Sequence, residues 1–542
     1  MEAKDLIRRF ESARSVRYNW EHHWQEVADL VLPTREFTYD YAPGEKRRNR
    51  IYSDVAPEAA ETLAAALSGM LTNTSVRWFS LIATDDRMKE SQAVSKYLYD
   101  TTQIMLDYFD SQQSGFSIAS HEMYLDIVTF GTGVMQVMDS GNGIRFQAKP
   151  LSAFYIVEDD NGEITESYRV FKLPAREAYD TFGDGLHPET IRGIEEGKYD
   201  RSEYGHESDG QIEFVHAILK RLDRDVLKLD STNMPYASYY VEKGNAHLIS
   251  EGGFKRMPYL FPRWSKAPAE TYGRSPAMKV LPGIKVANAM ARTILEAAEL
   301  AIRPPVMMPA NSIEGPLRTT PGSLIYYRQG TRDVPRPLIS GANPAVGEGL
   351  LQRQEARIER AFFMDKFKLP ESDRMTATEI IQRRQEGLLQ AAPILSRLYA
   401  EFLDPLIALT YEKMAEKNML PPVPEALQGR SFKVEYRSPM ASSKRSAHIQ
   451  AFLQAMQAAS PLLQVNPGVV QNLNSDVAFR DIFNATAVDP MYLKSQAEVD
   501  RGRQQQQQQQ AQMQQAQLIQ QQAQAAQASA DTLKTVQETR QP

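Results

Sequence analysis

The feature that most constrains this chain is a pair of helical segments that enclose a proline- and glycine-rich insert. A helix is predicted over residues 281–303, where Pro304-Pro305 end it, and a second one over 347–363, with the insert at 306–345. The first helix carries an apolar stripe, flanked by the small residues Ala287, Ala291 and Ala298, and formed by Val286, Met290, Ile294, Ala297 and Ala301. Such a helix has two faces to bury, and its hairpin partner covers one. The other face requires a surface outside the hairpin.

The segments before this hairpin are predicted to form helices first and strands afterwards. Apolar residues recur at helical spacing in four stretches, at residues 4–32, 57–70, 91–109 and 116–130. Gly131-Thr132-Gly133 is interpreted as the break between the two parts. Strand-like stretches follow at 154–158, 164–173, 212–218 and 238–241. Asn161-Gly162 predicts a hairpin turn between the first two strands, so an α+β fold is expected.

The segments after the hairpin begin with a clear helix start. Thr376 and Glu379 are spaced as a capping box, and the helix that starts there can run to Met419. Pro393 and Pro405 lie inside it, and each should kink or break it. One more strand is expected at 431–436. From Gln504 onward glutamine and alanine dominate, which favours either a helix or a disordered tail.

Composition limits the chemistry that the 542 residues can perform. The chain contains no cysteine, which excludes disulfides, thiolate metal sites and cysteine nucleophiles. The N-terminus is charged, and no apolar run reaches the roughly 18 residues of a membrane span, so we expect neither a secretory signal nor a membrane segment. The net charge of −6 argues against a high-affinity DNA binder. It is compatible with a protein that DNA slides past.

Motifs of catalysis and of cofactor binding are missing from the sequence. It contains no P-loop, no G-x-G-x-x-G, no H-E-x-x-H and no G-x-S-x-G, so we predict no catalytic, cofactor-binding or metal-binding residue. His22 and His23 are adjacent on a helix and therefore point apart. Glu158-Asp159-Asp160 is better explained as a solvated hairpin tip, and the basic run 46–50 as a solvated loop.

The ordered set of these segments resembles the portal, or head-to-tail connector, family of short-tailed phages. The resemblance spans nearly the whole chain, and its segments follow one another in the same order as in the family. It is carried by the strands around Asp160–Gly162, the stretch Arg263-Trp264 to Arg274, the unit 281–363, Met375–Glu379, Tyr436–Pro439, Asn474–Pro490 and Ala497–Val499.

The resemblance implies a portal fold that assembles into a dodecameric ring. By order along the chain, residues 1–278 would form a mixed wing of N-terminal helices and a β-rich part. The hairpin would form the stem, at 279–303 and 346–363, with a small clip insert at 304–345. Residues 364–375 would be a tunnel loop, and 376–437 a long kinked helix and a return strand. The helical crown would be 438–500, and 501–542 a Gln-rich helical barrel or a disordered tail.

The same resemblance implies a channel at the capsid vertex for packaging and ejection of double-stranded DNA. DNA would pass without sequence-specific contacts. The implied partners are further copies of the chain, the terminase large subunit, a tail adaptor, and the major capsid and scaffolding proteins. The ring would belong to the virion and assemble in the host cytoplasm, with no membrane involved.

Charged residues in the expected stem, tunnel loop and clip are the candidate site residues. Asp365, Lys366 and Lys368 would face DNA from the tunnel loop. The stem candidates are Lys285, Arg292, Arg353, Arg357 and Arg360, although the last three could instead pair with Glu355 or Glu359 between subunits. In the clip, Arg318, Arg328, Arg332 and Arg336 would form a positive collar that docks the motor and later the adaptor.

Two other classes of protein stay open from the sequence. One is a DNA-packaging enzyme, that is, a terminase or nuclease subunit. The missing P-loop opposes an ATPase, whereas sparse nuclease carboxylates leave no motif to test. The other is a different ring or shell protein of the virion, which the helix–insert–helix unit fits less well.

Overall fold

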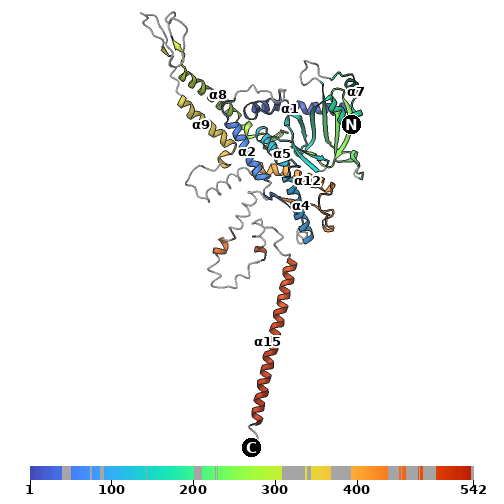
Figure 1. The fold of residues 1–542 in the computed structure, drawn as a ribbon, viewed down its shortest axis with the longest axis vertical. Helices are drawn as coiled ribbons and strands as arrows, with labels where there is room; N and C mark the ends of the chain where they lie inside the picture. The colour runs from blue at the N-terminus through green and yellow to red at the C-terminus, as the bar shows by residue number, and fades with distance from the viewer. Residues whose placement is uncertain are drawn as a thin grey trace. The chain divides into compact units, whose positions relative to one another are not determined.

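The chain contains two compact units in a computed structural model (Figure 1). The first comprises residues 1–78 and 104–420, and the second comprises 79–103 and 421–542. The structure describes residues 1–38, 51–73, 76–85, 91–141, 143–199, 210–225, 227–228, 230–307, 336–337, 344–367, 392–436, 451–452, 454–458, 474, 476–479, 482 and 496–538.

A five-stranded antiparallel sheet is the largest element of the first unit. Its strand order is β4-β5-β6-β7-β8, formed by β4 (Phe154–Glu158), β5 (Ile164–Pro174), β6 (Gln211–Lys220), β7 (Tyr236–Glu242) and β8 (His247–Phe254). The predicted Asn-Gly hairpin joins β4 to β5, because Gly162 adopts a φ of +85° and the Asp159 carboxylate accepts the backbone N–H groups of Asn161 and Glu163. The four strands expected from the sequence are confirmed.

Helices cover both faces of this sheet. On one face α1 (Ala3–Val31) inserts Leu6, Phe10 and Ala13 among the buried side chains of β4 to β7, where Phe10 meets the ring of Tyr155 edge-on at 5.1 Å. On the other face lie the short helices α6 (Ala175–Phe182) and α7 (Pro188–Glu195). The sheet is thus the centre of a layered core.

A second sheet has the order β3-β2-β9, with β2 (Met135–Ser140), β3 (Gly143–Ala148) and β9 (Tyr259–Leu260). It contacts α5 (Phe116–Phe130), which packs on α2 (Val55–Leu71). The predicted break at Gly131 is confirmed, since this residue ends α5 with a φ of +81°. A Cβ atom there would lie 2.3 Å from the Gly273 carbonyl oxygen, so only glycine fits.

The proline interruption of the long helix takes a form that the sequence did not predict. The capping box at 376–379 lies outside the described residues. Among the described residues, the helix at 392–398 continues through one π-turn, Tyr399–Leu403, into α12 (Asp404–Glu416). Pro405 has no N–H to donate to the preceding turn, and the wider π-turn accommodates this. Pro393 lies within the described helical segment 392–398.

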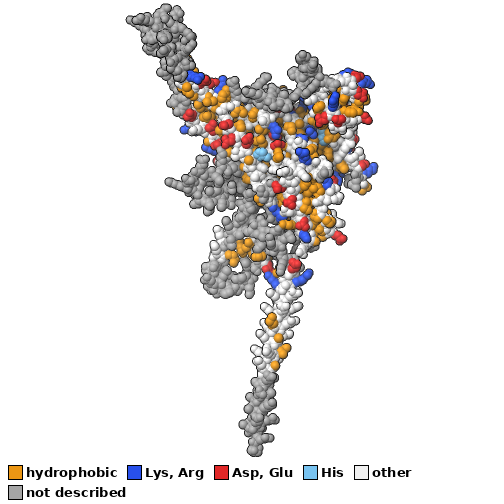
Figure 2. All heavy atoms as spheres, viewed as in Figure 1, with side chains coloured by type: hydrophobic (Ala, Val, Ile, Leu, Met, Phe, Trp, Pro, Cys, Tyr) orange, Lys and Arg blue, Asp and Glu red, His pale blue; other side chains and the backbone are white. Residues whose placement is uncertain are grey.

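In the second unit β1 (Phe79–Ala83) pairs with β12 (Phe432–Tyr436) in an antiparallel ribbon. The sequence predicted β12 and missed β1. This unit also contains part of α4 (Gln92–Asp110), and the Gln-rich stretch forms the 43-residue helix α15 (Gln496–Glu538). In Figure 2 the described part of α15 carries charged side chains only at its beginning and is interrupted farther along by a few apolar side chains. In the part of the chain that the structure describes, no helix has the length and hydropathy of a membrane span.

The buried His216 on β6 gives the fold a dependence on pH. Its Nδ1 lies 3.1 Å from the Tyr259 hydroxyl and its Nε2 2.9 Å from the Ser238 hydroxyl. Burial, and then the charge of Arg169, lower the pKa of His216 from 6.5 to about 3. The unfolded chain therefore binds more protons than the folded chain between these values, so the stabilisation is complete above pH 6.5 and is lost as the pH falls.

We expect His216→Gln to flatten the pH dependence of stability. Between pH 6 and pH 4 the wild-type protein should lose up to about 1.4 kcal/mol per pH unit relative to this variant. Chemical denaturation at several pH values measures the difference. His121→Gln on α5 serves as the control for the loss of a histidine outside this buried site. A slope for His216→Gln equal to that of the control would contradict the prediction.

Candidate functional site: the helical hairpin and its anchor

The predicted helix–insert–helix unit is present as an antiparallel hairpin of α8 (Pro276–Ile302) and α9 (Pro344–Ala361). Two glycines let the helices approach closely. A Cβ atom on Gly283 would lie 2.5 Å from Nε2 of Gln354, and one on Gly347 would lie 2.9 Å from Cγ1 of Ile294. The sequence reasoning assigned close approach to alanines and did not single out these glycines.

The body of the first unit covers a face of α8 other than the predicted apolar stripe. The buried side chains are Leu281, Ile284, Ala287 and Ala291, which face the contacts of α8 with α1, α2 and α5. Of the predicted stripe, Val286 is half exposed and Ala301 is exposed, while its other members are partly buried. The small alanines lie where the helices approach most closely, because a larger side chain would hold α8 away from the body.

Apolar side chains remain uncovered on both helices of the hairpin. On α8 they are Val286, Leu295, Leu300 and Ile302, and on α9 Val346 and Leu350, with between 45% and 79% of each side chain exposed. Single exposed apolar residues are common, and six on one hairpin make it a candidate contact surface.

The two stem cations on α8 form ion pairs within the chain. Nζ of Lys285 lies 2.8 Å from a Glu26 oxygen, and Nε of Arg292 lies 2.8 Å from a Glu296 oxygen. Arg292 also lies over the ring of Tyr52, at 6.0 Å from its centroid. A surface groove separates α1 from α8 here, and its lining consists of Leu30, Tyr52, Lys285, Asn288, Ala289 and Arg292.

Arg353, Arg357 and Arg360 lie on one exposed face of α9, as their spacing predicts. Arg357 donates to the Gln354 side chain at 3.4 Å. Among the described residues, none of the three forms an ion pair, and Glu355 accepts instead from the Ser53 hydroxyl at 3.4 Å. This face therefore presents three cations to whatever lies next to it.

The tunnel-loop and clip candidates lie largely beyond what the structure describes. Asp365 is exposed on the short helix α10 (Met364–Phe367), which also contains the backbone of Lys366. Arg336 belongs to the two-residue strand β11 (Arg336–Pro337), paired with β10 (Val306–Met307). Lys368, Arg318, Arg328 and Arg332 lie outside the described residues.

The base of α8 is tied to the end of α5. Ser275 caps α8, since its Oγ accepts the Met278 N–H at 2.9 Å and donates to the Thr129 carbonyl at 2.7 Å. The Gly273 N–H donates to the Thr132 hydroxyl at 2.9 Å, next to the close contact of Gly131 with Gly273. The start of the hairpin is therefore fixed by hydrogen bonds to a buried helix end.

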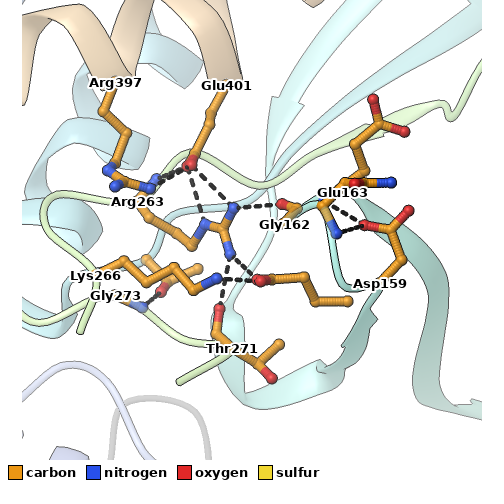
Figure 3. Close-up of polar contacts among 12 residues, drawn as sticks. Asp159, Gly162, Glu163, Arg263, Lys266, Thr271, Gly273, Arg397 and Glu401 are labelled. Atoms are coloured by element: carbon orange, nitrogen blue, oxygen red, sulfur yellow. Dashed lines mark hydrogen bonds and ion pairs between the residues drawn. The ribbon is translucent and has the colours of Figure 1, made fainter. Parts of the chain in front are cut away.

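Arg263 is the centre of a buried polar cluster beside this base (Figure 3). Glu401, in the π-turn, accepts from Nε at 3.0 Å and from Nη2 at 2.9 Å. The carbonyls of Thr271 and Gly162 accept at 3.0 and 3.1 Å, and Glu158 forms a further ion pair with Arg263 and one with Lys266. Arg397 also pairs with Glu401, at 2.8 Å. We call this group the Arg263 cluster; its members are Glu158, Gly162, Arg263, Lys266, Thr271, Arg397 and Glu401.

The carboxylates of the Arg263 cluster affect the pKa of Arg263 more strongly than its burial does. Burial alone would lower the pKa of Arg263, but the hydrogen bonds and charges of Glu401 and then Glu158 hold this pKa above its usual value. The cluster joins the β4–β5 turn, the segment that leads into α8, and the helix at 392–416. The sequence noted Arg263 only within a family-typical stretch, and nothing in it identified Glu401.

Comparison with known proteins assigns this architecture to a family. A family model described as bacteriophage head to tail connecting protein matches residues 3–493. The chain belongs to this family. It is similar to the probable portal protein of Bordetella phage BPP-1, with 29% identity over 93% of this chain and 91% of the relative. It is also similar to the portal protein of Salmonella phage epsilon15, with 28% identity over the same shares of the two chains.

The chain is accordingly a portal, or head-to-tail connector, protein of a tailed phage, and the resemblance noted in its sequence is confirmed. Proteins of this connector family are structural rather than enzymatic, which sets aside the packaging-enzyme alternative. Membership of the connector family also sets aside the alternative of a different ring or shell protein. The family implies an oligomeric ring at the head–tail junction that contacts head and tail components. The α+β class is confirmed by the antiparallel sheets and their helices.

We expect Arg263→Ala to destabilise the first unit strongly. Removing one partner of a buried ion pair leaves unpaired charge inside the protein and costs about 3–5 kcal/mol. Chemical denaturation measures the loss. The matched control is Arg256→Ala, which removes an exposed pair with Glu412 at 3.0 Å and should cost less than about 1 kcal/mol. Equal losses for the two variants would contradict the role given to Arg263.

Proposed function

We propose that copies of this chain form a ring around a channel, with the α8/α9 hairpin as its stem. The observation that carries the proposal is the set of uncovered apolar side chains on both helices of the hairpin. In a ring with rotational symmetry, one side of each hairpin contacts the opposite side of the next, and no side stays open. Each buried CH₂ contributes about 0.8 kcal/mol, so small contacts accumulate around a closed ring.

We infer the remaining division of the chain from its order. Residues 1–278 form the wing and 304–345 the clip between the stem helices. Residues 364–375 form the tunnel loop, 376–437 return to the wing, and 438–500 form the crown. The mostly amide surface of α15, on which Met513, Leu518 and Ile519 are exposed, supports a barrel of such helices from several copies, because a long helix that buries so little apolar surface gains little stability alone.

DNA would pass this channel without strong binding. Twelve copies at −6 each carry −72, and an acidic or mixed wall repels phosphate. A few cations at one height would then grip the duplex, and we assign this role to Lys366 and Lys368, next to Asp365. Arg353, Arg357 and Arg360 are secondary candidates for the same contact. Their exposure equally fits pairing with Glu355 or Glu359 of a neighbouring copy.

The clip would dock the terminase large subunit during packaging and the tail adaptor afterwards. Arg318, Arg328, Arg332 and Arg336 would repeat around the ring as a positive collar. The wing and crown would contact the major capsid and scaffolding proteins at the capsid vertex. Packaging and ejection of the genome would then use one passage.

Ring assembly should depend on the uncovered face of the hairpin. Leu350→Asp should cost the isolated chain little, since the side chain is 51% exposed, yet it would place a charge between copies and prevent closure. The control is Leu222→Asp in the loop between β6 and β7, where the side chain is 88% exposed. Electron microscopy and native mass spectrometry should show rings for the wild type and the control only. Normal rings from Leu350→Asp would refute burial of this face between copies.

The tunnel-loop assignment predicts a separation of assembly from DNA handling. Lys366→Ala combined with Lys368→Ala should leave ring formation unchanged, because the proposal assigns both lysines to contact with DNA and not to contact between copies. The double variant should alter packaging or retention of the genome, because the phosphate contacts are gone. DNA content of particles measures this, with Lys279→Ala on α8 as the control. Full and stable genomes in the double variant would remove these lysines from the proposal.

A further inference from the structure

The turn between β4 and β5 contains an asparagine in a chemically reactive sequence. Asn161 is followed by Gly162, which has no side chain to shield its backbone nitrogen. The Asn161 side chain is exposed, and no hydrogen bond to another described residue holds its amide group. The backbone nitrogen of Gly162 can therefore reach the side-chain carbonyl carbon of Asn161, unless the turn keeps the two atoms apart.

The reaction open to this pair is deamidation. The Gly162 nitrogen gives up its proton and forms a bond to Cγ of Asn161, the bond from Cγ to the side-chain nitrogen breaks, and ammonia leaves with the proton. Water then opens the cyclic imide at either carbonyl carbon. One opening gives aspartate, and the other gives isoaspartate, in which the backbone runs through the former side-chain carbon.

The fold opposes the first step of this reaction through Asp159. Its carbonyl oxygen accepts the Gly162 N–H at 3.0 Å, so the nitrogen that must lose its proton is held in a hydrogen bond. Its carboxylate accepts the N–H groups of Asn161 at 3.0 Å and of Glu163 at 2.9 Å (Figure 3). We call these three hydrogen bonds the Asp159 clamp. The acidic side chains of Asp160 and Glu163 add negative charge nearby, which disfavours a deprotonated nitrogen.

The same turn supplies one of the carbonyls that surround the buried Arg263. The Gly162 carbonyl oxygen accepts from Nη2 of Arg263 at 3.1 Å, and Glu158 at the start of the turn forms an ion pair with the same guanidinium. An isoaspartate at position 161 would add a carbon atom to the backbone directly before Gly162. This lengthening would move the Gly162 carbonyl away from Arg263 and leave a buried N–H without its acceptor.

We propose that Asn161 is a deamidation site that the Asp159 clamp restrains in the folded protein, and that isoaspartate formation there breaks the contact of the turn with Arg263. Glycine is required at position 162, since its φ is +85°. The chain therefore keeps a reactive dipeptide at this turn, and hydrogen bonds protect it. All residues involved belong to one copy of the chain, so the reaction does not depend on ring formation.

Peptide mass spectrometry of the full-length protein, incubated at neutral pH, tests the clamp. Conversion of Asn161 should be at least about tenfold slower in the folded protein than in urea, because hydrogen bonds that include a charged acceptor must break first. Asp159→Ala should raise the folded rate toward the rate in urea. The matched control is Asp160→Ala, which removes a neighbouring charge but no described hydrogen bond, and it should change the rate far less. Asn142-Gly143 is the same dipeptide elsewhere in the chain, and its rate should not respond to Asp159→Ala.

The unfolding of deamidated protein tests the link to Arg263. The deamidated fraction, isolated by ion exchange, should unfold at a lower denaturant concentration than the Asn161→Asp variant, which has the same charge and an ordinary backbone. Equal rates in the folded protein and in urea would overturn the clamp, and so would equal rates for Asp159→Ala and Asp160→Ala. Equal unfolding midpoints for deamidated protein and Asn161→Asp would overturn the link to Arg263.

Discussion

Arg263 is buried, and the arrangement of the first unit depends on keeping its charge paired. A guanidinium inside a protein is costly unless carboxylates and carbonyls surround it. Here Glu401 and Glu158 supply the carboxylates, and Gly162 and Thr271 supply the carbonyls. These groups come from three segments of the chain that are distant in sequence. Since displacing any one of them would leave buried charge unpaired, the sheet, the approach to α8 and the π-turn are held as one piece.

The hairpin differs from the rest of the first unit because more of its apolar side chains are exposed. Close to the base, Trp24, Phe37, Phe130 and Tyr272 form a cluster of aromatic rings with centroids about 5 Å apart, and α8 is capped by Ser275. Farther along, α8 and α9 cover only one side of each other and leave apolar side chains exposed. A fixed base with an incompletely covered hairpin is compatible with the oligomeric ring that the family implies, in which neighbouring copies could cover the exposed side chains.

Local sequence signals predicted the four N-terminal helices, four strands of the larger sheet and β12 within one or two residues, whereas β2, β3, β8, β9, α6 and α7 were not predicted. The four N-terminal helices, the Asn161-Gly162 turn and β12 follow from periodicity, prolines and glycines. The strand β1 was missed because its partner β12 lies about 350 residues later in the chain. The π-turn before Pro405 was also missed, since a proline indicates an interruption without specifying its form. For the candidate site residues, the sequence correctly predicted that Arg353, Arg357 and Arg360 lie on one side of a helix.

The sequence by itself determined the order of the elements, the existence of the hairpin and the family to which they belong. These follow from spacings of a few residues and from their order, which a linear pattern records. Tertiary structure alone decided which face of α8 is buried, and that Ala287 and Ala291 lie inside while Val286 is half exposed. It also decided the partner of Arg263, 138 residues away. Burial and charge pairing depend on groups brought together by folding, and no local pattern encodes them.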